Sequence, residues 1–176
     1  MKEKVNIFWF RRDLRLHDNA GLYHALKEGT PVLPVFIFDK DILDKLEDSN
    51  DKRVAFIYSC LEELQQQLVS VGSGLFVYYG YPIDVFRSLN EEFAIQKVFT
   101  NHDYEPYALE RDGKVAEFLS SNQISFHTSK DQVIFEKSEI LKENNTPYTV
   151  FTPYSRKWKS SLNDFYLSSY PTEKYF

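Results

Sequence analysis

Residues 5–19, VNIFWFRRDLRLHDN, join an apolar run to a dense group of charges. The run over residues 5–10 has one polar interruption, which is typical of a strand covered on both faces. Three arginines and two aspartates follow it directly, and the first glycine comes only at Gly21. The strand exit of a dinucleotide-binding α/β protein normally carries glycines, so this charge requires another explanation.

Four further apolar runs alternate with helical patterns up to residue 127. We expect strands at residues 5–10, 32–38, 75–79, 97–100 and 124–127. Apolar spacings of three and four predict helices over residues 19–27, from a cap at Asn50 or Asp51 to Gly72, and after Pro82 and Pro106. Asp18 is the expected cap of the first helix. This alternation predicts an α/β fold, a doubly wound parallel sheet with helices on both faces.

The composition fits one globular domain with an extension. The chain has 176 residues, of which 43% are hydrophobic and 27% charged. We predict a domain over residues 1–130, followed by an extension over residues 131–176, in which residues 132–158 read as an irregular strand and loop stretch that ends in a basic-aromatic segment. A net charge of −5 argues against nucleic-acid binding by this chain alone.

Two absences bear on the compartment. No apolar run approaches the roughly 18 residues of a membrane span, and no segment has the order of a signal peptide. The single Cys60 excludes an internal disulfide and fits a reducing compartment. We therefore expect a cytoplasmic protein without membrane contact.

Charged and polar residues follow three of the predicted strands. In open α/β sheets, ligands bind beyond the carboxyl ends of the strands, where the winding direction reverses. The residues at these exits are Arg11, Arg12, Asp13, Asp39, Asp41 and residues 101–105, NHDYE. The alternative is that the arginines and aspartates only pair with each other, and that Asp103 or Glu105 favours a helix N-terminus.

Several common sites lack their motifs in this chain. There is no G-x-G-x-x-G, no G-x-x-x-x-G-K-[ST] and no G-x-S-x-G segment. The four histidines lack the spacing of metal ligands, so we expect no metal site. Without a nucleophile or an acid-base pair, we expect no catalytic residue in this chain.

Four separated segments carry a resemblance to a known family. They are WFRRDLRLHDNAGL at residues 9–22, RVAF with CLEEL at 53–64, NHDYEPYALERD at 101–112 and PYTVFTPYSRKW at 147–158. In order and spacing the chain resembles the DNA photolyase and cryptochrome family, specifically its N-terminal α/β domain, which holds a light-harvesting antenna chromophore. The resemblance implies a Rossmann-like sheet of five parallel strands in the order 3-2-1-4-5, in which strands one and four are neighbours.

The resemblance also implies how the antenna would be held. The matching positions are Arg11, Phe38, Arg53, Asn101, Asp103 and Glu105. Arg11 would approach from the exit of the first strand, Phe38 would form an apolar wall, and Arg53 would reach toward the ring or its polar tail. The two carboxylates would accept hydrogen bonds from the ring edge or the ribityl hydroxyls, with the asparagine supporting them.

One departure from the family pattern bears on the identity of the chromophore. EPYALERD resembles the segment of members that bind 8-hydroxy-deazaflavin or FMN. Members with a folate antenna carry an Asn-Glu pair where this chain has Tyr107 and Ala108. We therefore expect a deazaflavin or FMN antenna rather than folate.

The resemblance places the catalytic machinery outside these residues. Family members continue into a helical domain that binds FAD and receives UV-damaged DNA, and residues 131–176 would be the linker and the start of that connection. The chain would be the antenna-binding domain of a deoxyribodipyrimidine photo-lyase, an enzyme that repairs cyclobutane pyrimidine dimers by light-driven electron transfer from FAD. Alone it would be inactive and would not bind the DNA. Its unpartnered aromatic tail would favour self-association.

Two other functions stay open at this point. A cryptochrome blue-light photoreceptor would share all of these residues, because the groups that separate repair from signalling lie in the missing domain. A stand-alone nucleotide or flavin-binding module would need a glycine-rich phosphate loop, which the chain lacks.

Overall fold

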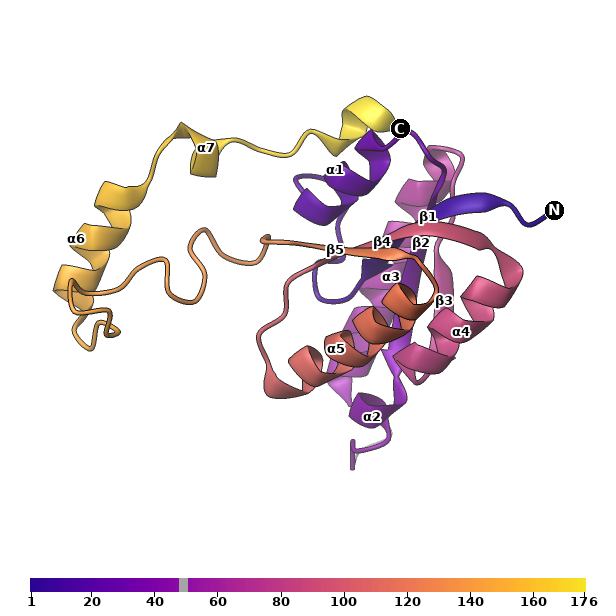
Figure 1. The fold of residues 1–176 in the computed structure, drawn as a ribbon, viewed down its shortest axis with the longest axis horizontal. Coiled ribbons are helices and arrows are strands. Elements are labelled where there is room, and N and C mark those ends of the chain that lie inside the picture. The colour runs from indigo at the N-terminus through magenta and orange to yellow at the C-terminus, as the bar shows by residue number, and fades with distance from the viewer. Residues whose placement is uncertain (48–50) are drawn as a thin grey trace.

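A sheet of five parallel strands forms the middle layer of the protein, shown in Figure 1 as a computed structural model that describes residues 1–47 and 51–176. The strands are β1 (Lys4–Phe10), β2 (Val32–Asp39), β3 (Phe76–Gly80), β4 (Ala94–Asn101) and β5 (Ser125–Ser129). They lie in the order β3-β2-β1-β4-β5, and every neighbouring pair is parallel. The predicted fold class and strand order are confirmed.

Helices cover both faces of the sheet because successive side chains of a strand point to opposite sides. The long helices are α1 (Ala20–Lys27), α3 (Lys52–Ser70), α4 (Pro82–Glu92) and α5 (Pro106–Ser121). Ile7 and Trp9 of β1 pack with α4 and α5, whereas Phe8 and Phe10 pack with α1 and α3. The central strand is therefore apolar on both sides, as its sequence indicates.

Side chains at the helix N-termini fix where two of these helices begin. Asn19, rather than Asp18, caps α1, because its side chain accepts a hydrogen bond from the Leu22 amide. Asp18 has a left-handed backbone with φ of 48° and accepts a hydrogen bond from the Tyr170 amide instead. Asp51 caps α3, and the alternative cap Asn50 lies outside the described residues.

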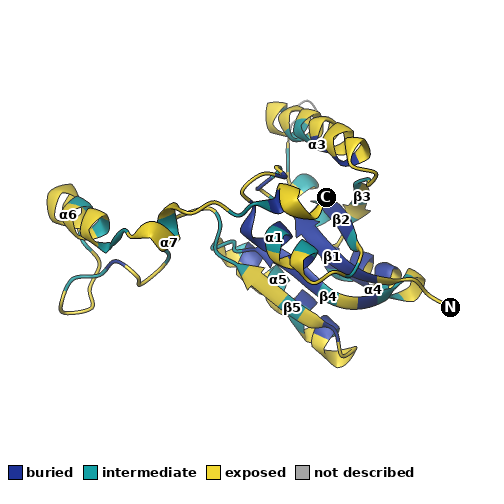
Figure 2. Ribbon diagram, turned by 90° about the horizontal axis from the view of Figure 1, so that it is seen from above, coloured by how far each residue is buried: buried dark blue, intermediate teal, exposed yellow. Residues whose placement is uncertain are grey.

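The C-terminal part contains helices where we predicted an irregular strand and loop stretch. Helix α6 (Phe151–Ser161) and the short α7 (Asp164–Leu167) form an arm that extends away from the sheet (Figure 2). Pro153 lies in the first turn of α6, where proline is tolerated because its missing N–H would have no helical partner. The proline therefore permits the helix, and the prediction was wrong for residues 151–158, whereas residues 132–150 form neither a helix nor a strand.

The chain returns from the arm to the sheet layer at its end. A 3-10 turn, η1 (Thr172–Tyr175), lies against α1. The Thr172 side chain is fully buried and its hydroxyl donates to the Leu16 carbonyl. The domain boundary at residue 130 stays a prediction. Residues before and after it contact each other. Every helix within the described ranges is too short or too polar to cross a bilayer.

Candidate ligand-binding cleft

A cleft of about 230 Å³ lies beyond the carboxyl ends of β1 and β2. Its walls come from the strand exits, the short helix α2 (Lys40–Leu43), the second turns of α3 and α5, and the segment after β4. Its apolar lining includes Trp9, Phe38, Ile42, Leu43 and Ile57, and its charged lining includes Arg11, Arg12, Asp39, Asp103, Glu105 and Arg111. The cleft therefore lies at the edge of the sheet where the sequence predicted a ligand.

Two buried arginines form one wall of the cleft. The guanidinium groups of Arg11 and Arg111 lie 5.1 and 4.9 Å from the Trp9 ring, a cation–π geometry. Arg11 donates to both carboxylate oxygens of Asp112, at 2.6 and 2.7 Å. Burial lowers the pKa of Arg11 and the Asp112 carboxylate opposes that shift. The Arg11 side chain is thus already paired with Asp112, which largely neutralises its charge.

Beneath the cleft, Asp13, Asn19 and Asn101 form a buried polar network. The Asn101 amide nitrogen donates to Asn19 Oδ1 at 2.9 Å and also to the Asp13 carboxylate. Its Oδ1 accepts the Gly21 amide at 2.9 Å. Asn101 is only 3% exposed and does not line the cleft. It joins the exits of β1 and β4 to the start of α1 and supports the cleft from below.

The rim of the cleft is held by a weaker set of charges. Arg12 Nη1 lies 3.0 Å from Glu105 and 3.4 Å from Asp103. The Arg12 and Glu105 side chains are mostly exposed, whereas Asp103 is nearly buried. Exposed ion pairs contribute little to stability, so a ligand can compete for these carboxylates at small cost.

Arg53 lies outside the cleft lining. Its side chain is 75% exposed and forms an ion pair of 2.5 Å with Asp51. The hydrogen bonds from Arg53 lower the pKa of Asp51 to about 2. Ile57, four residues further along α3, does line the cleft, so Arg53 lies one helical turn from it on the same side of the helix.

Tyr107 lies at the position that distinguishes this chain from the folate-binding pattern. Its hydroxyl donates to the buried Asp39 carboxylate at 2.6 Å. Burial, and then this hydrogen bond, raise the pKa of Tyr107 above its ordinary range. The phenol therefore keeps its proton and fixes the position of a cleft carboxylate.

The sequence reasoning did not single out Arg111 and Asp112. Both belong to α5, where Ala108, Val115 and Leu119 face the sheet. Residues three and four positions after Ala108 share that inward side, so helical periodicity could have placed Arg111 and Asp112 there. Charged residues are usually assigned to the exposed side of a helix, and the rule fails here because the two charges pair with each other.

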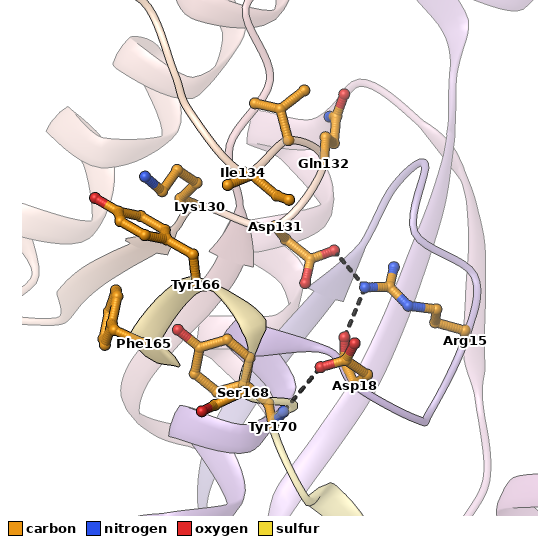
Figure 3. A pocket seen from close by; sticks show the side chains of 11 residues that line it. Arg15, Asp18, Lys130, Asp131, Gln132, Ile134, Phe165, Tyr166, Ser168 and Tyr170 are labelled. Atoms are coloured by element: carbon orange, nitrogen blue, oxygen red, sulfur yellow. Dashed lines mark hydrogen bonds and ion pairs between the residues drawn. The ribbon is translucent and has the colours of Figure 1, made fainter. Parts of the chain in front are cut away.

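A second depression lies between the loops after β1 and β5 and the C-terminal segment (Figure 3). Arg15 pairs with Asp131 at 2.8 Å and donates to the Asp18 carbonyl, and Asp131 also accepts the Ala20 amide. Lys130 pairs with Glu139. Because these charges satisfy one another, they serve to fasten the tail to the sheet layer. Arg12, Asp13 and Arg15 therefore find partners within this chain.

Several known proteins are similar to this chain both in sequence and in fold. The family model for DNA photolyase matches residues 6–173. The deoxyribodipyrimidine photo-lyase of Synechococcus sp. is 36% identical over 154 residues, which are 88% of this chain and 32% of that protein. Cryptochrome-1 of Gallus gallus is 31% identical over 138 residues, 78% of this chain and 22% of that protein.

Two solved structures agree with these relatives. A class III photolyase from Agrobacterium tumefaciens superposes with a TM-score of 0.80 at 28% identity, covering 92% of this chain and 33% of that chain. An archaeal photolyase from Sulfolobus tokodaii, solved with two FAD molecules, gives 0.72 at 30% identity, over 93% and 41%. The chain thus spans between 22% and 41% of the length of these four proteins. With its matching motifs and sheet order, the chain belongs to the DNA photolyase family and has the fold of the N-terminal α/β domain.

Proposed function

We propose that the cleft binds an antenna chromophore of the flavin or deazaflavin type in a light-driven photolyase. The observation that carries the proposal is that apolar side chains and hydrogen-bond acceptors line the same cleft. Trp9, Phe38 and Ile57 provide apolar surface for a flat ring, and Asp103 and Glu105 provide acceptors at its rim. Small-molecule sites are typically apolar with a few placed polar groups, which is this arrangement.

The size of the cleft supports a ligand whose ring system, and not its tail, is the part that is buried. Its volume of about 230 Å³ lies below the roughly 300–1,000 Å³ of typical ligand sites. A tricyclic ring would fill it and leave a ribityl tail at the rim, near the Arg12 pairs. The Sulfolobus photolyase contains two FAD molecules and was described as implying a novel light-harvesting cofactor. That description supports a flavin as an antenna within this family.

An antenna absorbs light and passes on the excitation, so the residues around it bind and orient rather than transfer protons. Phe38 and Trp9 would hold the ring, and the rim carboxylates would accept its N–H or hydroxyl groups. Arg11 would act through its position against Trp9, since its own hydrogen bonds are already made. Arg53 would take part only after leaving Asp51.

The activity of the whole protein is inferred from the family to which the chain belongs and not from this cleft. We propose that the complete protein binds FAD in a further domain and repairs cyclobutane pyrimidine dimers in UV-damaged DNA, and that this chain alone is inactive. The single Cys60 fits a cytoplasmic location. A cryptochrome photoreceptor is the second candidate, because cryptochrome-1 proteins are also similar. A repair assay on the complete protein separates the two.

Binding is tested by titrating the 176-residue chain with FMN, 8-hydroxy-deazaflavin, a reduced folate and ATP, followed by absorption and fluorescence. We expect saturable binding of a flavin-type ligand. Asp103→Asn with Glu105→Gln should weaken it by about tenfold or more, since two charge-assisted hydrogen bonds are lost. Glu110→Gln is the matched control, because Glu110 is an exposed α5 residue paired with Lys114.

Three results would count against the proposal. Equal binding by the double variant and the control would place the ligand elsewhere. Binding of ATP without any flavin would favour the stand-alone nucleotide module. Preference for the folate would contradict the interpretation of Tyr107 and Ala108.

A further inference from the structure

The segment between β4 and α5 presents alternate residues to two different sides. Asp103 and Glu105 line the ligand cleft, whereas His102 and Tyr104 do not. The side chains of His102 and Tyr104 instead both contact Glu136, which lies 34 and 32 positions later in the chain. Successive side chains of an extended segment point to opposite sides. A residue that fixes the side chains on one side therefore also fixes the direction of those on the other.

Glu136 binds this segment through a nearly buried carboxylate. Its side chain is 10% exposed, and His102 Nδ1 lies 2.9 Å from each carboxylate oxygen. A carboxylate only accepts hydrogen bonds, so Nδ1 is the donor. The Tyr104 hydroxyl donates to the same carboxylate. Burial, and then this hydrogen bond, raise the pKa of Tyr104, so the phenol keeps the proton that it donates. Both contacts are charge-assisted and belong to the stronger class of hydrogen bond.

Further contacts hold His102 in place. Its Nε2 lies 2.9 Å from the Thr128 hydroxyl of β5, and its backbone amide donates to the Ser129 carbonyl at 2.8 Å. The Gln132 side chain donates to the His102 carbonyl at 2.8 Å. The His102 ring and backbone are therefore fixed by β5 and the segment after it, and Glu136 joins this fixed group to Tyr104.

Glu136 is itself anchored in the segment after β5. Its amide donates to the Glu139 carboxylate, and the Glu139 amide donates to the Glu136 carbonyl at 2.9 Å. Lys130 pairs with Glu139 at 2.7 Å. The neighbouring Phe135 ring lies 4.7 Å from the Tyr166 ring of α7. Contacts to both the sheet layer and the arm thus hold Glu136 in a defined position.

The rim of the cleft needs such support because its own ion pairs are weak. Arg12 is the partner of Asp103 and Glu105, and its side chain is 54% exposed. Exposed pairs contribute little and do not hold a carboxylate in one direction. Groups that contact a ligand keep a productive geometry when supporting hydrogen bonds lock them from behind. In this segment the hydrogen bonds to Glu136 lie on the side opposite the cleft.

We propose that Glu136 is a positioning residue of the ligand cleft. It holds His102 and Tyr104 from outside the cleft, and in this way it directs Asp103 and Glu105 toward the ligand. The inference rests on the proposed chromophore site, because those two carboxylates are the acceptors assigned to the ligand there. Glu136 itself makes no contact with the ligand.

Titration of the full 176-residue chain with FMN and with 8-hydroxy-deazaflavin tests this role. Glu136→Ala should raise the dissociation constant of the bound ligand by at least about fivefold, because the rim carboxylates lose their fixed direction. Glu136→Gln removes the same charge but keeps an acceptor oxygen, so its dissociation constant should stay within about twofold of the wild type. Lys130→Ala is the matched control, because it breaks the pair with Glu139 in the same segment and leaves the hydrogen bonds of Glu136 in place.

Three titration results would overturn the proposal. The first is wild-type affinity in Glu136→Ala. The second is equal weakening in Lys130→Ala, since any loosening of the segment after β5 would then suffice. The third is equal weakening in Glu136→Gln and Glu136→Ala, which would assign the effect to the lost charge and not to the geometry.

Tyr104→Phe is a second variant that deletes a single hydroxyl, in case Glu136→Ala does not fold. It removes one of the two contacts to Glu136 and should raise the dissociation constant by about twofold to threefold. Unchanged affinity in this variant would also refute the positioning role.

Hydrogen exchange without ligand separates a failure of this inference from a failure of the chromophore site. The amides of residues 102–105 should exchange faster in Glu136→Ala than in the wild type, and at the wild-type rate in Lys130→Ala. If the wild type binds neither ligand, the chromophore site fails, and exchange still shows whether Glu136 holds the rim. Unchanged exchange at residues 102–105 in Glu136→Ala would refute the positioning role even when a chromophore binds.

Discussion

The buried polar network and the cleft rim are built from the same two segments of sequence, yet they differ in what holds them. Asp13, Asn19 and Asn101 lie under the cleft with their polar atoms paired inside the protein. Arg12 and Glu105 lie at its rim and pair largely in solvent. The charge after β1 therefore has two purposes. One part fastens the strand exits together, and the other forms exposed ion pairs at the rim.

The largest effect is expected from Asn101→Ala. It would leave the Gly21 amide without its acceptor and remove one hydrogen bond each from Asn19 and the buried Asp13 carboxylate, which should cost about 3 kcal/mol of unfolding free energy. Urea denaturation followed by circular dichroism measures the change. Asn90→Ala is the control, because the Asn90 side chain makes an exposed hydrogen bond of 3.3 Å to Asn122 and takes no part in the network. Similar losses of unfolding free energy in both variants would mean that the buried network stabilises the protein no more than an exposed hydrogen bond does.

Gly21→Ala tests the same network by steric means. An added Cβ would lie 2.7 Å from Asn101 Oδ1 and 2.8 Å from the Phe8 ring, so we expect a loss of about 2 kcal/mol. Gly113→Ala in α5 has open space at its Cβ and should stabilise the protein by up to about 1 kcal/mol, since alanine is the better helix former. Thermal unfolding of both variants gives the comparison. A neutral Gly21→Ala would show that α1 can move away from β4.

Tyr107→Phe tests the hydrogen bond that holds the Asp39 carboxylate in the wall of the cleft. Removing the hydrogen bond to Asp39 should cost about 1 kcal/mol at neutral pH. The folded chain holds the phenolic proton more tightly than the unfolded chain, because the pKa of Tyr107 is raised. This contribution is therefore complete below about pH 10 and declines as the pH rises further.

Denaturation of the wild type and Tyr107→Phe at neutral pH and just above pH 10 checks the sign. The difference between the two proteins should shrink at the higher pH. A difference that grows with pH would contradict the assigned hydrogen bond.

The smallest effect is expected from Arg12→Ala. Its ion pairs with Asp103 and Glu105 are solvent-exposed at the arginine, so the unfolding free energy should change by less than about 0.5 kcal/mol. The same urea denaturation applies, with 0.5 M salt added to screen the pairs. A loss as large as that of Asn101→Ala would remove the distinction between network and rim.

Much of the fold could be predicted because its signals are local. The apolar run of β1 and the three-and-four spacing in α3 each show their structure within one segment. The ends of elements could not be predicted to the residue, since Asn19 and Asp18 are equally good caps by residue type. Only the backbone conformation at Asp18 decides between them. Helix α6 escaped prediction because a proline in the first turn looks like an interruption.

The place of the site could also be predicted, but not the state of its residues. Arg11, Asn101 and Arg53 were all expected to serve a ligand, and their binding roles stay predictions. In the structure, Arg11 is paired inside the wall, Asn101 is buried below it, and Arg53 faces solvent. Residue type and position at a strand exit cannot distinguish these states, since they depend on what the rest of the chain packs against them.

The sequence by itself determined the layers of the protein and the edge of the sheet at which a ligand could bind. Strand and helix periodicity are local, and parallel strands necessarily bring their carboxyl ends to one edge. Only the tertiary structure decided the partners. Arg11 is neutralised by Asp112, which lies 101 positions later in the chain. Hydrogen bonds and burial depend on distances in space, and those exist only once the sheet and its helices have packed together.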